Sequence, residues 1–283
     1  MKRFTAEIPE EKFEIFLVEF NGYGVEILNR ENGNITFAVY SEKGQGEAFK
    51  EALLEIFKDL NAGKIIKEEK IEDKPWDEVW KEDFPPIEAK PFIIIPEWEI
   101  YKENEFIPIK IKIGMSFGTG LHPTTQLVLS LLPKYVTKED TVLDIGCGTG
   151  ILGIAASKLG AKEVFTIDID EKAIEECEIN AWENEVKLKC KVTDIDEIEG
   201  KYDVVLANLQ IEIFEKYFNK IAQLFNKYLI ISGVFKKEKD RILELAQENR
   251  LELVEEKAKP ESPTKPEDLW YGFVFKKQQK AAE

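Results

Sequence analysis

The first 71 residues show the pattern of a small α/β unit. Short apolar segments predict four strands, at residues 4–8, 25–28, 35–40 and 64–71. Apolar residues recur every three or four positions after Pro9 and again between Glu47 and Leu60, which predicts two amphipathic helices. Asn32-Gly33-Asn34 is a hairpin signal between the middle strands. The order β-α-β-β-α-β predicts a ferredoxin-like domain over residues 1–72, with a role in substrate recognition.

Residues 73–100 are rich in proline and tryptophan, which predicts an interdomain linker. Trp76 and Trp80 lie four positions apart on a short predicted helix, Trp76–Phe84. Such a pair more often anchors a linker helix than stacks on a ligand. Within the same segment, Phe92–Ile95 predicts a short buried strand.

From residue 107 onward strands alternate with helices of about ten residues, which predicts a Rossmann-like, doubly wound sheet over residues 101–283. The predicted strands are 107–113, 142–145, 164–169, 187–192, 204–208, 227–232, 251–257 and 270–275. The predicted helices are 123–132, 151–159, 171–184, 211–225 and 237–247. A proline-rich loop, 260–266, joins the last two strands as a hairpin, so the mostly parallel sheet should end with an antiparallel strand.

The strand Thr141–Ile145 runs into a glycine-rich turn that is a candidate cofactor site. Glycines such as Gly146 and Gly148 lack the Cβ atoms that would keep a nucleotide-like ligand away from the backbone. Two patterns fit the turn: Gly146-x-Gly148-x-Gly150, and the dinucleotide fingerprint Gly148-x-Gly150-x-x-Gly153. The second keeps an NAD-dependent oxidoreductase open as an alternative.

Polar residues stand at the carboxyl ends of successive predicted strands, where such sheets bind ligands. Asp168 is placed to accept both hydroxyls of an adenosine ribose, Asp194 to meet an adenine amino group, and Asn208 to hold a substrate. Asp144 could hold the glycine turn or accept from a cofactor amine. Singly, Asp168, Asp194 and Asn208 could each be only a helix N-cap, but all three landing at strand ends favours a common site.

The composition narrows the classes of partner. The formal net charge of −16 argues against direct nucleic-acid binding, which needs a basic face. One histidine and three cysteines without metal-type spacing argue against a metal site. We find no signal-peptide core and no apolar run of membrane length, so we expect no membrane association and a cytoplasmic location.

Two motifs resemble a known family. VLDIGCGTG followed by TIDID resembles the S-adenosylmethionine-binding core of class I methyltransferases. FGTGLHPTT, at Phe117–Thr125, resembles more specifically the ribosomal protein L11 methyltransferase (PrmA) family. The linker pattern Trp76-x-x-x-Trp80-Lys81-x-x-Phe84 and the small unit before it are similar too. The resemblance therefore spans nearly the whole chain.

The resemblance implies a protein N-methyltransferase that uses S-adenosylmethionine to methylate lysine and N-terminal amines of a basic ribosomal protein, free before assembly. We expect a monomer. Positions matching the family's cofactor contacts are Thr125, Gly146, Asp168 and Asn208. Phe117–Gly120 matches the loop that closes over the methyl donor, so we expect Phe117, Gly118 and Thr119 at the methyl-transfer site, with Asn208 positioning the substrate.

The sequence departs from the family pattern at Leu209–Glu212 and around 259–267, both on the substrate side. These departures keep open a methyltransferase of the same fold that acts on another protein or on a small-molecule amine. Nucleobase methylation is disfavoured, because Leu209-Gln210 stands where those enzymes carry a proline-aromatic turn. A non-catalytic binding module is disfavoured by the intact glycine turn. His122 could act as a base, but His122-Pro123 more simply begins a helix.

Overall fold

The computed structural model describes residues 2–20, 25–31, 33–41, 45–70, 85–99, 105–112 and 117–278. It divides into two compact units, Met1–Asp83 and Phe84–Glu283, each of which is treated by itself. The predicted helix that carries Trp76 and Trp80 lies outside the described residues.

The first unit is an antiparallel sheet with two helices. Its elements are β1 (Lys2–Pro9), α1 (Glu10–Phe20), β2 (Val25–Glu31), β3 (Asn34–Ser41), α2 (Gly46–Asp59) and β4 (Lys64–Lys70). The strand order is β2-β3-β1-β4, with every pair antiparallel. Alternate side chains of β1 lie on one face of the sheet, as the strand period of two requires. Those of Phe4, Ala6 and Ile8 pack in a core with phenylalanines from both helices and from β3. The element order is the one expected from the sequence.

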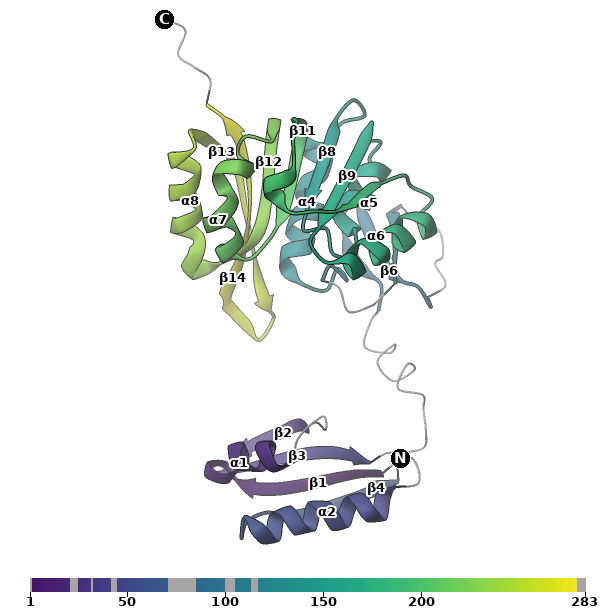
Figure 1. Ribbon diagram of the computed structural model, residues 1–283, viewed down its shortest axis with the longest axis vertical. Helices are drawn as coiled ribbons and strands as arrows, with labels where there is room; N and C mark the ends of the chain where they lie inside the picture. Colours follow the sequence, from purple (N-terminus) through teal and green to yellow (C-terminus); the bar gives the residue numbers. More distant parts are fainter. Residues whose placement is uncertain are drawn as a thin grey trace, which may run out of the picture. The chain divides into compact units, whose positions relative to one another are not determined.

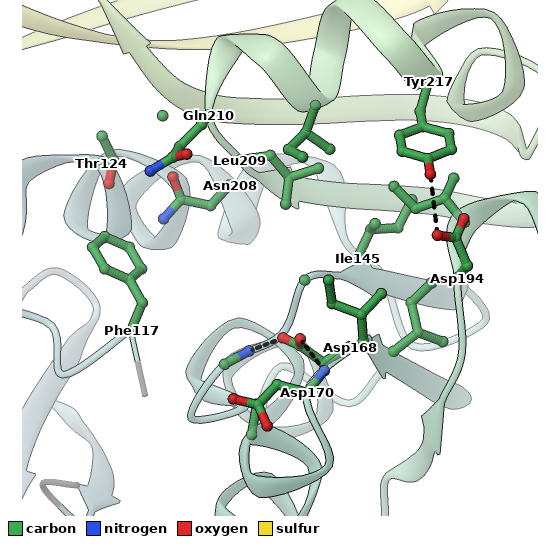
Figure 2. A pocket seen from close by; sticks show the side chains of 18 of the residues that line it. Phe117, Thr124, Ile145, Asp168, Asp170, Asp194, Asn208, Leu209, Gln210 and Tyr217 are labelled. Atoms are coloured by element: carbon green, nitrogen blue, oxygen red, sulfur yellow. Dashed lines mark hydrogen bonds between the residues drawn. The ribbon is translucent and has the colours of Figure 1, made fainter. Parts of the chain in front are cut away.

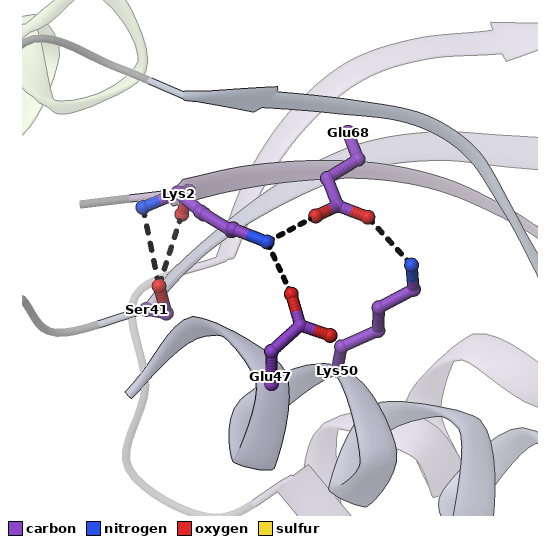
Figure 3. A network of polar contacts seen from close by, with 5 residues as sticks. All are labelled: Lys2, Ser41, Glu47, Lys50 and Glu68. Carbon is purple, nitrogen blue, oxygen red and sulfur yellow. Dashed lines mark hydrogen bonds and ion pairs between the residues drawn. The ribbon is translucent and has the colours of Figure 1, made fainter. Parts of the chain in front are cut away.

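Ion pairs join the first strand of this unit to its second helix and its last strand (Figure 3). The Nζ atom of Lys2 lies 2.5 Å from carboxylate oxygens of both Glu47 and Glu68. Lys50 reaches the second oxygen of Glu68 at 2.6 Å. One carboxylate thus bridges two ammonium groups, which fixes the position of α2 along β1 and β4.

The second unit opens with a separate three-stranded sheet formed by β5 (Ile87–Ala89), β6 (Phe92–Pro96) and β7 (Ile107–Ile111). The expectation that the strand at residue 107 starts the doubly wound sheet is therefore wrong, because β7 pairs with β6 instead. The side chain of Asn184, the C-cap of helix α6 (Glu171–Glu183), joins this sheet to that helix: it accepts from the Lys110 N–H at 2.9 Å and donates to the Lys110 carbonyl at 2.6 Å.

The large sheet has seven strands in the order β10-β9-β8-β11-β12-β14-β13. The strands are β8 (Thr141–Ile145), β9 (Glu163–Asp168), β10 (Lys189–Val192), β11 (Tyr202–Asn208), β12 (Phe225–Phe235), β13 (Leu251–Ser262) and β14 (Lys265–Lys277). The helices are α4 (Pro123–Tyr135), α5 (Ile151–Lys158), α6 (Glu171–Glu183), α7 (Ile211–Ile221) and α8 (Lys239–Glu248). β14 is antiparallel to β12 and to β13, and the other pairs are parallel, as predicted.

Helices cover both faces of this sheet (Figure 1). Residues that alternate along a strand enter different cores: Val142 packs with α4 and α5, and its neighbour Leu143 packs with α7 and α8. Ile230 and Ile231 divide in the same way. Strands buried on both faces explain why the sequence shows continuous apolar runs here.

Several boundaries differ from the sequence-based ones; helix α7, for example, ends at Ile221 rather than at residue 225. The loop between the last two strands is shorter than the predicted 260–266. Strand β13 continues to Ser262 and β14 begins at Lys265, so only a two-residue turn separates them. Helix α4 runs through Pro133 to Tyr135 rather than ending at residue 132. In the described part of the chain, no helix has the length and apolar character needed to cross a bilayer.

Candidate functional site

A cavity of about 750 Å³ lies where the parallel strands of the large sheet end (Figure 2). Ile145 ends β8, Asp168 ends β9 and Asn208 ends β11. In register, Ile145 lies opposite Ile167 and next to Ala207, so these strand ends meet at one edge. The cavity is lined by Phe117, His122, Thr124, Ile145, Gly146, Gly148, Ile167–Asp170, Ala173, Thr193–Ile195, Asn208–Gln210, Ile213, Lys216, Tyr217, Gly233 and Trp270.

The glycine turn after β8 forms one wall. The neighbouring strand β9 holds the backbone of this turn: the N–H groups of Gly146 and Cys147 both donate to the Ile167 carbonyl, at 2.9 and 3.0 Å. Gly148 has a φ of +52°, and a Cβ there would lie 2.2 Å from the Phe117 carbonyl oxygen. No other residue fits at this position, because both the backbone conformation and the space exclude a side chain. The predicted cofactor residues Gly146 and Gly148 both line the cavity.

Asp168 is a structural part of that turn as well as a wall residue. Its carboxylate accepts from the N–H of Gly148 at 3.0 Å and from the N–H of Asp170 at 3.1 Å. The N-cap of α6 is Asp170, so the simple capping explanation for Asp168 is wrong. A carboxylate held by two backbone N–H groups is already oriented before any ligand binds, and lone pairs remain for ligand hydroxyls.

Asp194 lies across the cavity from the glycine turn. One of its oxygens caps a short 3₁₀ helix by accepting from the Asp196 N–H at 3.0 Å. The other accepts from the hydroxyl of Tyr217 on α7 at 3.1 Å (Figure 2). These bonds, the Asp196 N–H foremost, hold the pKa of the Asp194 carboxyl below its ordinary value. Asp194 is therefore both the cap that the sequence allowed and an ionised acceptor in the cavity.

Asn208 carries the most conspicuous polar atom of the site. Its side-chain oxygen is buried and has no hydrogen-bond partner. The residue is not a helix N-cap, because Gln210 takes that position on α7. The loop after β11 passes close to the backbone of Gly233, and only glycine allows this approach, because a Cβ there would lie 2.1 Å from the Leu209 carbonyl oxygen. An unpaired buried acceptor is costly, and this oxygen is left able to accept a hydrogen bond.

The predicted loop at residues 117–120 contacts the glycine turn directly. The Thr149 N–H donates to the Phe117 carbonyl at 3.0 Å, and the Thr149 hydroxyl donates to the Gly118 carbonyl at 2.7 Å. The Phe117 side chain lines the cavity and is 55% exposed. Gly118 and Thr119 do not line it.

Thr125 does not line the cavity either, whereas its neighbour Thr124 does. Thr125 is fully buried in α4, and its hydroxyl has no hydrogen-bond partner. The structure thus places Phe117, Gly146, Gly148, Asp168, Asp194 and Asn208 around one cavity, and leaves Gly118, Thr119 and Thr125 behind its wall.

His122 begins helix α4, as expected, with Pro123 in the first turn. Its Nδ1 accepts from the Thr124 N–H at 3.3 Å and lies 2.8 Å from the Thr124 hydroxyl. Burial lowers the pKa of the imidazole, while Glu261 opposes this to a smaller extent. With Nδ1 used as an acceptor, the single ring proton of neutral His122 lies on Nε2. This arrangement favours the structural role over a general base.

Asp144, two residues before the turn, does not line the cavity. It is fully buried, and the N–H of Gly153 donates to one of its oxygens at 3.0 Å. The carboxyl therefore holds helix α5 against β8. Among the described residues no group of three or more histidine, cysteine, aspartate or glutamate side chains is placed to bind a metal ion.

Comparison with known proteins decides between the cofactors that the turn allows. The family model for ribosomal protein L11 methyltransferase (PrmA) matches residues 10–262. The chain belongs to this family. The ribosomal protein L11 methyltransferase of Aquifex aeolicus is 40% identical over 279 residues, covering 98% of both chains. That of Thermotoga petrophila is 34% identical, covering 97% of both.

The solved structures include a ribosomal protein L11 methylase from Lactobacillus delbrueckii subsp. bulgaricus. It is 28% identical, with a TM-score of 0.63, and covers 69% of this chain and all of its own. The protein is thus a methyltransferase with S-adenosylmethionine as methyl donor, and the NAD-dependent alternative is set aside. The Rossmann-like class of the second unit is confirmed.

The cavity of this methyltransferase fits its donor. Gly146 and Gly148 let Leu209 and Phe117 pack against the turn where a Cβ would clash with them, Asp168 offers a fixed carboxylate for the ribose, and Asp194 an acceptor for the adenine amine. Ile145, Ile167 and Ile195 supply apolar walls between them. The motif residues that line the cavity thus offer groups that suit the donor.

The lining residues that sequence reasoning missed include Gln210, Tyr217 and Trp270. Gln210 was noted only as a departure from the family pattern. Tyr217 is one of many apolar positions on the inner face of α7, and its hydroxyl partner lies 23 residues away. Trp270 was placed only at the start of a strand, and no local signal links it to residue 122.

Proposed function

We propose that this methyltransferase transfers methyl groups to lysine side-chain and N-terminal amines of ribosomal protein L11. The observation that carries the proposal is the unpaired, buried oxygen of Asn208 in the cavity wall. An amine is an N–H donor, so it pairs with this oxygen and keeps its lone pair free for the methyl carbon. A carboxylate or thioether acceptor would leave the Asn208 oxygen unpaired.

Bound S-adenosylmethionine supplies an activated methyl group, because attack by the amine nitrogen forms the N–C bond while the S–C electron pair returns to sulfur. The chain's own residues supply position. Asp168 and Asp194 fix the two ends of the adenosine, and Asn208 orients the amine. Alignment of this kind accounts for a large share of the barrier to a bimolecular step.

The amine must be neutral when it reacts. A free lysine has a pKa of about 10.4 and an α-amine about 8, so both arrive largely protonated at neutral pH. Phe117, His122, Thr124, Asn208, Leu209, Gln210, Gly233 and Trp270 form the acceptor end of the cavity. None of these side chains is a carboxylate that would hold the proton on the amine. Desolvation there favours the neutral form, and the proton leaves to solvent.

For the N-terminal unit we propose a ferredoxin-like substrate-recognition domain at residues 1–72, followed by a linker. The β2-β3-β1-β4 order supports the fold assignment. Because β5 and β6 pack in the second unit, the catalytic domain is best started near residue 84 rather than 101. A basic ribosomal protein, free in the cytoplasm before assembly, suits a monomeric enzyme of net charge −16, since opposite charge speeds encounter.

A second candidate is an amine of another protein or a small molecule. Gln210, exposed in the cavity wall where the sequence departs from the family pattern, is the observation that favours it. One experiment separates the two. The purified enzyme and methyl-labelled S-adenosylmethionine are added to a lysate that lacks the cell's own copy. Label in the single band of L11 supports the proposal, label elsewhere supports the second candidate, and no label refutes both.

A further inference from the structure

A row of aromatic rings forms the acceptor end of the cavity. The ring centroids of Phe117 and His122 lie 5.4 Å apart, those of His122 and Trp270 4.8 Å, and those of Trp270 and Phe235 5.1 Å, each pair tilted or edge-on. Phe117, His122 and Trp270 line the cavity. The rings come from three separate parts of the chain, so only the fold brings them together.

Trp270 is held in this row from two sides. On β12, Phe235 is its strand partner and packs against its ring. On β13, the exposed carboxylate of Glu261 accepts a hydrogen bond from the indole Nε1–H. Both residues of this bond belong to the β13–β14 hairpin, and Glu261 lies in the segment around 259–267 where the sequence departs from the family pattern. A charge-assisted bond to a carboxylate limits rotation of the ring.

Resting on the proposed function, we propose that Trp270 is the wall of an acceptor subsite for an alkylammonium group, and that Glu261 is the positioning residue that fixes its ring. Aromatic faces attract ammonium groups, most strongly the indole of tryptophan. The Glu261 carboxylate adds negative charge beside the ring at the solvent side. The subsite thus captures the protonated amine, which gives its proton to solvent before its nitrogen reaches the Asn208 oxygen.

The Glu261 carboxylate beside the indole favours a cation, while Lys259, the strand partner of Trp270, directs its Nζ to the side-chain oxygen of Gln126. An anionic acceptor group would be repelled by Glu261, whereas a neutral hydroxyl would gain nothing from the ring faces. The one cationic lining residue, Lys216, bonds to the Tyr217 hydroxyl at 2.5 Å beside Asp194, at the adenosine end.

The test compares Trp270→Ala, Trp270→Phe, Glu261→Ala and Glu261→Gln with Glu267→Ala, an exposed glutamate on the same hairpin. For L11 as acceptor, Trp270→Ala should raise KM about tenfold and Glu261→Ala about threefold. Glu261→Gln should recover part of the loss, because its amide oxygen still accepts from the indole. Donor affinity by calorimetry should match that of Glu267→Ala in every variant, and thermal unfolding should match it in Trp270→Phe and in both Glu261 variants.

A second measurement does not depend on catalysis. The indole Nε1–H resonance of Trp270, assigned by its loss in Trp270→Phe, is followed by nuclear magnetic resonance with S-adenosylhomocysteine present. It should shift in Glu261→Ala but not in Glu267→Ala, and it should shift when Nα-acetyl-lysine methylamide is titrated. An indole signal unmoved by the amine, or an acceptor KM equal in all variants, overturns the inference. If the wild type leaves L11 unmethylated while the indole signal still responds to the amine, the proposed target fails and the subsite stands.

Discussion

The hydroxyl of Thr149 donates a hydrogen bond of 2.7 Å to the carbonyl of Gly118. The two residues are 31 positions apart, and the bond joins the loop that carries Phe117 to the glycine turn. Thr149 is fully buried, so neither partner can replace the bond with water. The position of the Phe117 ring over the acceptor end of the cavity therefore depends on the donor-binding turn.

Thr149→Val tests this dependence, because it keeps the shape of the side chain and removes the donor. We expect the free energy of unfolding to fall by about 1–2 kcal/mol, since the Gly118 carbonyl is left unpaired. We also expect faster hydrogen exchange at the amides of residues 118–121 and weaker donor binding. Thr264→Val, in the exposed hairpin turn, is the control and should change none of the three. Unchanged exchange at 118–121 would show that the bond does not hold the loop.

Asp144 should make stability depend on pH. Burial raises the pKa of its carboxyl to about 8, against the opposing hydrogen bond from Gly153. The unfolded chain loses this proton near pH 4. The contribution of the proton to stability is therefore complete below about pH 4 and is lost as pH rises to about 8.

The comparison is Asp144→Asn, which cannot ionise. Its stability relative to the wild type should improve by up to about 1.4 kcal/mol per pH unit between about pH 4 and 8, and should level off above that range. Denaturant unfolding of both proteins at several pH values measures the difference. A difference that does not vary with pH would mean that Asp144 is ionised in the folded protein.

Tyr217 should tune recognition of the adenine ring through Asp194. Tyr217→Phe removes the 3.1 Å bond to the carboxylate, which is then held by backbone N–H groups, the Asp196 N–H foremost. We expect the affinity for S-adenosylhomocysteine to fall about threefold to tenfold. The affinity for the inosine analogue, which lacks the amino group, should change little. Tyr228→Phe, on β12, provides a matched loss of a hydroxyl. Equal losses for the two ligands would exclude this role for Tyr217.

The donor half of the site can be predicted from the sequence because its residues follow directly from the positions of the strands that they end. Gly146 follows the end of β8 and Asp168 ends β9, and parallel strands bring their carboxyl ends to one edge of a sheet whatever the details of packing. The acceptor half is not local. Trp270 reaches His122 across about 150 residues of chain, and nothing near either residue specifies the other. The prediction for β7 was wrong for a similar reason, since a short apolar strand does not specify its partner strand.

The methyl groups themselves test the central claim most directly. Free ribosomal protein L11 is incubated with the enzyme and S-adenosylmethionine, and the modified positions are mapped by mass spectrometry of its peptides. The Asp168→Ala variant, which loses the carboxylate held by Gly148, serves as the control and should transfer little. We predict mass increases of whole methyl groups at lysine side chains and the N-terminal amine. L11 that stays unmodified, or that carries methyl groups only on groups other than amines, would contradict the account.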